Sequence, residues 1–379
     1  MSEVRTRTEA SGTRPARRVR GRTCAWAAGA ALLLALPFYL DRFWLQAGLF
    51  AMAAAIGAIG LNLLTGATGQ LSMGHAFFLA VGAYAYCVFA SDGGAGLTGL
   101  GLPSWLAVIL AVLVAGVAGG LFSPIAGRLR GAYLGIATLA LIFIGQHVLF
   151  NARDLTGGFN GRDVPPLSVL GLTFDDRELV VAAVPFGSAE KLWYAGLLLL
   201  LGGALFARGV LRGRPGRAMN AIRDHRIAAG VIGVPVARYR AAVFVLSSMY
   251  AGLAGVLLAL VFQRTVPDYF GMTLSLEYLA MIVIGGLGSV AGAVVGAAFV
   301  SLLPQLLTRY SDALPLVSEP GTGGIAPGEA ARYLYGAAVV AVVLFLPGGL
   351  VRVAALRRAR SRPAPDAQPK ARSIPGEER

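Results

Sequence analysis

The side chains of this sequence that could do chemistry are polar residues that interrupt otherwise apolar segments. From residue 60 to residue 78 the sequence reads GLNLLTGATGQLSMGHAFF. Backbone that is broken at the depth of a bilayer is tolerated only where protein or water covers it. Asn62, Gln70, Ser72 and His75 are therefore predicted to face a protein interior or a translocation path. His75 either relays protons or packs two helices through a hydrogen bond, and we favour the hydrogen bond.

A second interrupted segment, residues 275–296, carries a carboxylate. Glu277 is followed by the pair Gly285 and Gly286 and by further glycines at the small-xxx-small spacing of close helix contacts. An ionisable residue inside a span is a functional-site hypothesis by default. Glu277 is either a pathway residue or a carboxylate at the outer interface. Gly-broken segments in both halves of a chain can mark a transport site near the middle of the membrane.

A third segment, residues 213–240, is predicted to hold a short helix that is too charged to span. Pro215 and Gly216 open it, and Gly233 with Pro235 closes it. Two adjacent alanines, 228 and 229, offer a flat surface that could press into a groove of another protein. The alternative is a basic loop that only maintains topology.

Catalytic and cofactor chemistry find no support in the sequence. The apolar spans lack an Asp pair, and no partner for His75 or His147 is evident, so neither an acid–base site nor a nucleophilic site is predicted. No Gly-x-x-x-x-Gly-Lys-[Ser/Thr] loop occurs, which excludes this chain as an ATPase. Cys24 and Cys87 show no metal-ligand spacing, so we predict no metal and no cofactor.

Long apolar stretches must position these segments. The chain is 56% hydrophobic and 14% charged, and about 20 apolar residues match the ~30 Å hydrocarbon core of a bilayer. We predict an all-α, polytopic membrane protein with about eight to ten crossings, the number depending on whether the uncharged breaks at 64–70 and 285–289 are full turns. The predicted spans are 24–40, 43–64, 70–90, 104–126, 131–150, 192–212, 241–262, two within 275–308, and 331–350.

The arginines give this model an orientation, because Lys and Arg collect on the cytoplasmic side of membrane spans. Segments predicted to be cytoplasmic hold seven Lys or Arg in residues 1–23, two at 128–130, eight at 208–240 and eight from 352 onward, whereas external segments hold eight in all. Both termini are therefore predicted to be cytoplasmic. The net charge of +14 reflects a membrane face in contact with the lipid bilayer, and we predict no nucleic-acid binding.

The same map predicts the domain organisation. Residues 1–23 are predicted to form a basic cytoplasmic tail, 24–350 a transmembrane domain, and 351–379 a disordered basic tail. Within the middle domain, 151–191 is an external, periplasmic loop and 213–240 a cytoplasmic loop. The external loop contains Thr156, Gly157, Gly158, Asn160 and Gly161, which are either an ordinary surface turn or a recurring family feature.

Four segments give the chain a family resemblance. The Ala-Ala-x-x-x-Gly spacing at 228–233 is similar to the loop by which ABC importer permeases dock on their ATPase subunits, although Ile227 stands where an acidic residue often precedes it. The stretches at 60–78, 155–161 and 275–296 are similar to those of branched-chain amino acid permeases. The chain, from about residue 56 to 350, thus resembles branched-chain amino acid ABC transporter permeases of the LivM type.

This resemblance implies a bacterial inner-membrane importer subunit with several partners. Separate ABC ATPase subunits would dock on Arg223, Asp224, Ala228, Ala229 and Gly233. A second, LivH-like permease chain and a periplasmic substrate-binding protein would complete the system. The alternatives are a urea or short-chain amide permease, an ion-coupled secondary transporter, and an intramembrane enzyme.

Overall fold

The computed structural model describes residues 33–310, apart from residues 95, 130, 170, 171, 175–178, 182 and 183, and residues 326–345, 349 and 350. The two predicted tails, 1–23 and 351–379, lie outside the described residues. So does most of the predicted span 24–40, of which the described part contains helical residues 33–35 and the 3-10 turn η1 (Leu36–Phe38).

Helices dominate the described residues, which confirms the predicted all-α class. The long helices are α2 (Arg42–Leu61), α3 (His75–Ala90), α4 (Ser104–Arg128), α5 (Ala132–Asn151), α7 (Ser188–Arg212), α10 (Val236–Phe262), α11 (Met272–Gly285), α12 (Val290–Arg309) and α13 (Pro327–Phe345). The short ones are the π-helical turn η2 (Asn62–Gly66), α6 (Arg153–Thr156), η3 (Gly158–Asn160), α8 (Arg214–Asp224), α9 (Arg226–Val231) and η4 (Pro267–Phe270).

Short strands occur at one end of the bundle, and each pairs antiparallel with one other strand. The pairs are β1 (Arg162–Asp163) with β6 (Arg264–Thr265), β2 (Ser168–Val169) with β3 (Leu172–Thr173), and β4 (Leu179–Val181) with β5 (Val184–Phe186). The first pair joins the loop after α5 to the end of α10. This pair therefore links segments that are distant in sequence, whereas the other two pairs are local hairpins within the loop before α7.

Six stretches of the described chain are long and apolar enough to cross a bilayer: Arg42–Gly66, Ser104–Arg128, Ala132–Asn151, Ser188–Arg212, Val236–Phe262 and Val290–Arg309. α3 and α11 are shorter, with 16 and 14 residues. At 1.5 Å per residue they span about 24 and 21 Å, less than the ~30 Å of a hydrocarbon core. The two short helices adjoin non-helical breaks at 69–74 and 286–289. The sequence predicted these interruptions at 64–70 and 285–289, so the first lies later in the chain than expected.

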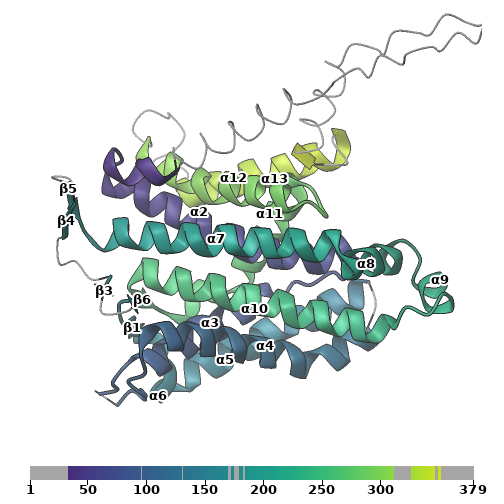
Figure 1. The fold of residues 1–379 in the computed structure, drawn as a ribbon, viewed down its shortest axis with the longest axis horizontal. Coiled ribbons are helices and arrows are strands. Elements are labelled where there is room, and N and C mark those ends of the chain that lie inside the picture. The colour runs from purple at the N-terminus through teal and green to yellow at the C-terminus, as the bar shows by residue number, and fades with distance from the viewer. Residues whose placement is uncertain are drawn as a thin grey trace, which may run out of the picture.

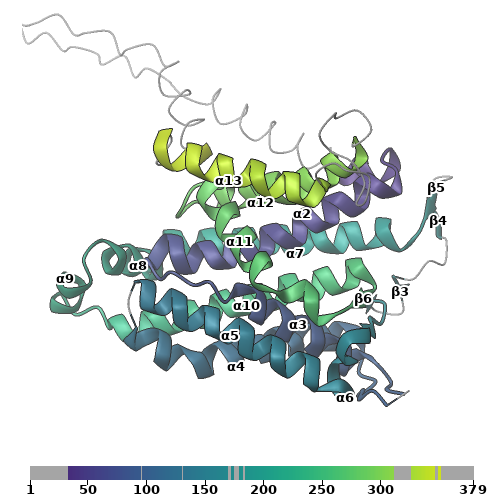
Figure 2. The same ribbon diagram turned by 180° about the vertical axis from the view of Figure 1, so that it is seen from behind.

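The long helices lie side by side, with α8 and α9 at one end of the bundle and β4 and β5 at the other (Figures 1 and 2). α10 packs against α2, α3 and α4, and α2 also packs against α7 and α12. In the most apolar stretch of Arg42–Gly66, 83% of residues are buried, against 17% for Ser188–Arg212. α2 is therefore the centre of the bundle, and α7 offers most of its surface to the surroundings.

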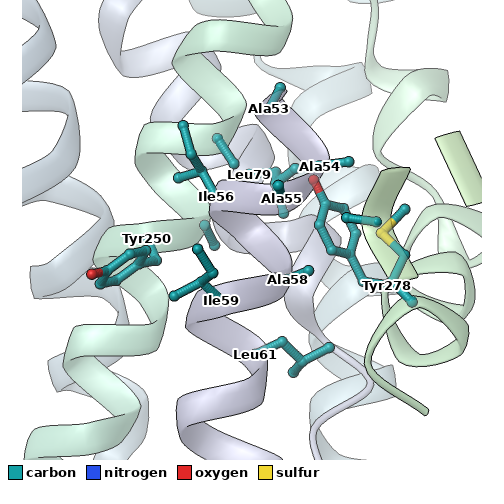
Figure 3. Packing of buried hydrophobic residues seen from close by; sticks show 14 of the residues in the cluster. Ala53, Ala54, Ala55, Ile56, Ala58, Ile59, Leu61, Leu79, Tyr250 and Tyr278 are labelled. Carbon is teal, nitrogen blue, oxygen red and sulfur yellow. The ribbon is translucent and has the colours of Figure 1, made fainter. Parts of the chain in front are cut away.

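Small residues on α2 let its neighbours approach closely. Tyr250 of α10 and Tyr278 of α11 flank α2 on opposite sides (Figure 3). A Cβ on Gly57 would lie 2.6 Å from a ring carbon of Tyr278, and one on Gly60 would overlap the Cβ of Tyr250. Close approach through small residues is the usual way in which helices associate in a membrane, where burial of apolar surface gives little driving force.

Candidate functional site

The two interrupted segments meet in the structure through the amide of one residue. Nδ2 of Asn62 donates to the carbonyl oxygen of Ser289 (2.8 Å), and Oδ1 of Asn62 accepts from the backbone N–H of Gly288 (2.8 Å). A Cβ on Gly66 would overlap both Asn62 Oδ1 and Gly288 N. We call this contact, formed by Asn62, Gly66, Gly288 and Ser289, the break junction. Its buried backbone groups are thereby hydrogen-bonded, as broken backbone inside a membrane requires.

Side chains of the first interrupted segment replace the missing helical hydrogen bonds. Thr65 Oγ1 donates to the carbonyl oxygen of Gln70 (3.0 Å), and Thr68 Oγ1 donates to that of Leu64 (2.6 Å). Nε2 of Gln70 donates to Thr68 Oγ1 and to the carbonyl oxygen of Arg240. Gln70 is buried, and its Oε1 has no hydrogen-bond partner among the described residues. The segment is thus enclosed by protein, and Gln70 retains one acceptor for a further group.

His75 begins α3 inside the same enclosed region. One of its ring nitrogens lies 2.9 Å from the carbonyl oxygen of Gly57, and its ring meets that of Tyr278 edge-on at 5.0 Å. Ser275 Oγ accepts from the backbone N–H of Ala76, so α11 caps the start of α3. Ser72 is buried one turn earlier, and its Oγ accepts from the N–H of Gly74 (3.4 Å). His75 and the adjacent Ala76 therefore join α2, α3 and α11, whereas the bond of Ser72 stays within the segment before α3.

Glu277 lies apart from the break junction. It lines a cavity of about 220 Å³ between α2, α10, α11 and α12, together with Phe50, Phe262, Tyr278, Ser301 and Gln305. We call this space the Glu277 cavity. Oε1 of Glu277 also accepts from the O–H of Tyr335 on α13 (3.1 Å). Gly285 and Gly286, in contrast, end α11 beside the break junction, so the structure divides the second segment between two places.

The predicted cytoplasmic loop folds as α8 and α9, which project from the end of the bundle (Figures 1 and 2). Met219 and Ile222 of α8 are buried against the bundle. Nη1 of Arg223 donates to the carbonyl oxygen of Gly66 (3.0 Å), while its Nε is 3.1 Å from Asp224 Oδ1. The loop is therefore bonded to the break junction, a connection that the sequence did not predict.

The two alanines of the loop have different environments. Ala228 is exposed, whereas Ala229 is 2% exposed and packs inward. The flat surface expected from both alanines is therefore not present. The exposed apolar residues are Ile227, Val231 and Ile232, at 74%, 83% and 74%. Sequence reasoning missed them, although three large aliphatic residues in a charged loop were the available signal.

Local interactions define where α9 begins and ends. His225 Nδ1 accepts from the N–H of Ala228 and caps the first turn. Gly233 follows the helix with φ of +87°, a left-handed conformation that glycine adopts without a steric cost. Gly233 thus turns the chain from α9 into α10.

The predicted external-loop residues lie in one turn, which is bonded to Arg264. Thr156 Oγ1 donates to Leu149 O and accepts from the N–H of Gly158, while Gly157 and Gly161 have positive φ. The carbonyl oxygen of Asn160 accepts two bonds from Arg264.

Arg162, which follows this turn, is 2% exposed. It donates to the carbonyl oxygens of Cys87, Thr98 and Leu155. Arg162 therefore ties the loop to α3, a structural role that the sequence analysis did not assign.

Six stretches of the described chain can cross a bilayer. Further apolar helices surround the backbone breaks, which protein encloses. These features define a multi-pass membrane protein. The family model described as "Branched-chain amino acid transport system / permease component" matches residues 44–343. The chain belongs to this family of transport permeases, which confirms the resemblance drawn from the four sequence segments.

Individual relatives agree with this assignment. The high-affinity branched-chain amino acid transport system permease protein LivM of Salmonella typhimurium is 29% identical over 293 residues, which cover 74% of this chain and 67% of that protein. LivM of Escherichia coli matches with the same identity and coverage. LivH of Salmonella typhimurium is 27% identical over 269 residues, covering 68% of this chain and 82% of that protein. No solved structure matches the chain significantly.

Proposed function

We propose that this chain is the membrane-spanning subunit of an ATP-driven importer of branched-chain amino acids in a bacterial inner membrane. Family membership and the similarity to LivM and LivH support this proposal. In this proposal the end with α8 and α9 is cytoplasmic, because residues 208–240 hold eight arginines. The end with β4 and β5 faces the periplasm, and both termini are cytoplasmic.

One observation carries the coupling part of the proposal, namely the hydrogen bond from Arg223 to the carbonyl oxygen of Gly66. α9 presents exposed aliphatic residues beyond the bundle, and α8 connects α9 to the break junction through Arg223 and the buried Met219. A partner that grips α9 and closes on ATP would therefore shift the ends of α2 and α11. Such shifts of packed helices are a common way in which a local event becomes a global transition.

The remaining parts of the system are separate proteins in this proposal. ABC ATPase subunits hydrolyse ATP, a LivH-like permease packs against this chain within the bilayer, and a periplasmic binding protein delivers the amino acid. The chain itself performs no catalysis. Exposed aliphatic side chains such as Leu121 and Leu198, at 77% and 72%, suit a surface that meets lipid or the second permease.

The test is transport by the complete complex. The chain is co-expressed with the adjacent permease, ATPase and binding-protein genes and reconstituted in proteoliposomes, and the uptake of labelled leucine and labelled urea is measured. The proposal expects leucine uptake that requires ATP on the side of the membrane that α8 and α9 face. This uptake should persist after ion gradients are dissipated. Uptake of urea alone, or leucine uptake driven by an ion gradient without ATP, would contradict it.

A further inference from the structure

We propose that the Glu277 cavity binds a primary ammonium ion carried on a short branched aliphatic chain, which is the ammonium end of the transported amino acid. This inference rests on the proposed function, because it assigns part of the import pathway. It goes beyond that function by naming the side chains that receive the substrate.

The cavity reaches from one end of the helices toward the middle of α2. Phe50 and Ala54 line it from α2, and at 1.5 Å per residue they lie about 12 and 18 Å along the helix from Arg42. α2 with its continuation runs for 25 residues, so Ala54 is near the middle of this span. The cavity therefore extends from the end of α10, at Phe262, and the first turn of α11, at Leu274, to the middle of α2. Glu277 is half-buried in its wall, and an ionisable residue inside a membrane span is a functional-site hypothesis by default.

The electrostatics of the lining select a cation. Glu277 is the only charged residue in the described lining of the cavity. Tyr335 donates to one carboxylate oxygen, and a carboxylate has acceptor capacity for several more donors. Arg332, on α13, interacts electrostatically with Glu277. Its side chain is exposed and does not line the cavity. An ammonium group inside would thus meet a carboxylate that is held in place and can accept further hydrogen bonds.

Aromatic side chains reinforce this selection. The rings of Phe50 and Phe262 lie 5.0 Å apart at the cavity wall, and aromatic faces attract ammonium groups. Tyr278 also lines the cavity, whereas its buried O–H lies toward Gly57 of α2.

The rest of the lining fits the other parts of a small amino acid. Ser301 and Gln305, one turn apart on α12, can donate to a carboxylate, and the aliphatic residues Leu258, Met281 and Val300 can pack against a branched side chain. The volume of about 220 Å³ is below the ~300–1,000 Å³ of typical ligand pockets. The cavity therefore suits a ligand smaller than a drug-sized molecule.

Binding to the purified complex in lipid nanodiscs tests the assignment with three probes of one shape. Leucine has both charged groups, isoamylamine lacks the carboxylate, and 4-methylpentanoate lacks the ammonium. We expect leucine and isoamylamine to bind and 4-methylpentanoate to fail. Glu277→Gln should weaken isoamylamine at least about tenfold, since a hydrogen bond to a charged group is lost. The control Glu329→Gln makes the same change at an exposed carboxylate outside the cavity and should leave the affinity unchanged.

A second measurement does not depend on the stability of Glu277→Gln. Ser301→Cys, in a background with Cys24 and Cys87 replaced by Ala, is labelled with a maleimide. Leucine and isoamylamine should slow the labelling, and 4-methylpentanoate should leave it unchanged. Ala54→Phe, which fills the cavity, should abolish this protection.

Several outcomes would overturn the inference. They are wild-type affinity of Glu277→Gln for isoamylamine, equal binding of 4-methylpentanoate and isoamylamine, and no binding of any probe to the wild-type complex. ATP-dependent leucine uptake by that same wild-type complex would leave the proposed function standing in each case. Absence of that uptake would remove the proposed function as well.

Discussion

The side chain of Asn62 accepts a hydrogen bond from the backbone N–H of Gly288, a residue 226 positions later in the sequence. The same side chain donates to the carbonyl oxygen of Ser289. One buried amide thus gives the N–H of Gly288 its partner and adds a second bond to the carbonyl oxygen of Ser289, which also accepts from the N–H of Ala293 in α12. This contact holds the end of α2 to the turn between α11 and α12.

Asn62→Ala should therefore destabilise the protein. It leaves the N–H of Gly288 without its partner and removes one of two bonds to the carbonyl oxygen of Ser289, the other coming from the N–H of Ala293. A polar group left unpaired away from water costs about 1–3 kcal/mol. We expect a lower midpoint of thermal unfolding for the purified protein in detergent. The matched control is Asn151→Ala, because Asn151 is exposed and bonds within its own helix. An equal shift for both variants would contradict the role of Asn62.

Gly66→Ala should separate the two interrupted segments. The added methyl group would overlap Gly288 N and Asn62 Oδ1, and neither can move without opening the break junction. We expect a marked loss of thermal stability or of transport. Gly209→Ala is the control, because an added Cβ at Gly209 of α7 meets nothing within 4 Å, and Ala in a helix is favoured over Gly by about 1 kcal/mol. A Gly66→Ala protein as stable and active as wild type would show that the junction is loosely packed.

Arg223→Ala should uncouple ATP hydrolysis from transport. Loss of its bond to Gly66 O removes the direct polar link between α8 and the break junction. The buried apolar contacts of α8 remain, so the loop should stay folded. We expect ATPase activity of the complex to persist while leucine uptake falls at least about fivefold, the lower range of a typical coupling energy. Arg217→Ala, an exposed change on the same helix, should leave both activities near wild type.

The sequence predicted the elements of this site better than their contacts. Glycine and polar interruptions within apolar sequence indicated both breaks, because such residues end helices whatever their partners are. The bond between Asn62 and Gly288 was not predictable, because it depends on how α2 and α12 pack. The orientation of Ala229 was likewise set by packing, because α9 contacts α8 and α10, and a six-residue helix is too short for its periodicity to define the buried face.

The tip of α9 should be the surface that an ATPase subunit grips. Ile227 and Val231 are exposed, so Ile227→Asp and Val231→Asp should leave folding intact and reduce the amount of ATPase that co-purifies with the chain. Ala229→Asp should act differently, because it places a charge at a buried position and lowers stability. Normal co-purification with both tip variants would exclude this surface as the contact.

Labelling of single cysteines should reveal which end of the bundle is cytoplasmic. α8 and α6 lie at opposite ends of the bundle (Figure 1). Asp224 ends α8 and Asn160 follows α6 closely, and both are exposed, so each can be replaced by Cys in a background with Cys24 and Cys87 changed to Ala. A membrane-impermeant maleimide should label Asn160→Cys in intact spheroplasts and Asp224→Cys only in inverted membrane vesicles. The arginines at 208–240 give the physical reason, because positively charged loops are retained in the cytoplasm. Labelling of Asp224→Cys from outside the cell would reverse the orientation and place α9 beyond the reach of any ATP-hydrolysing partner.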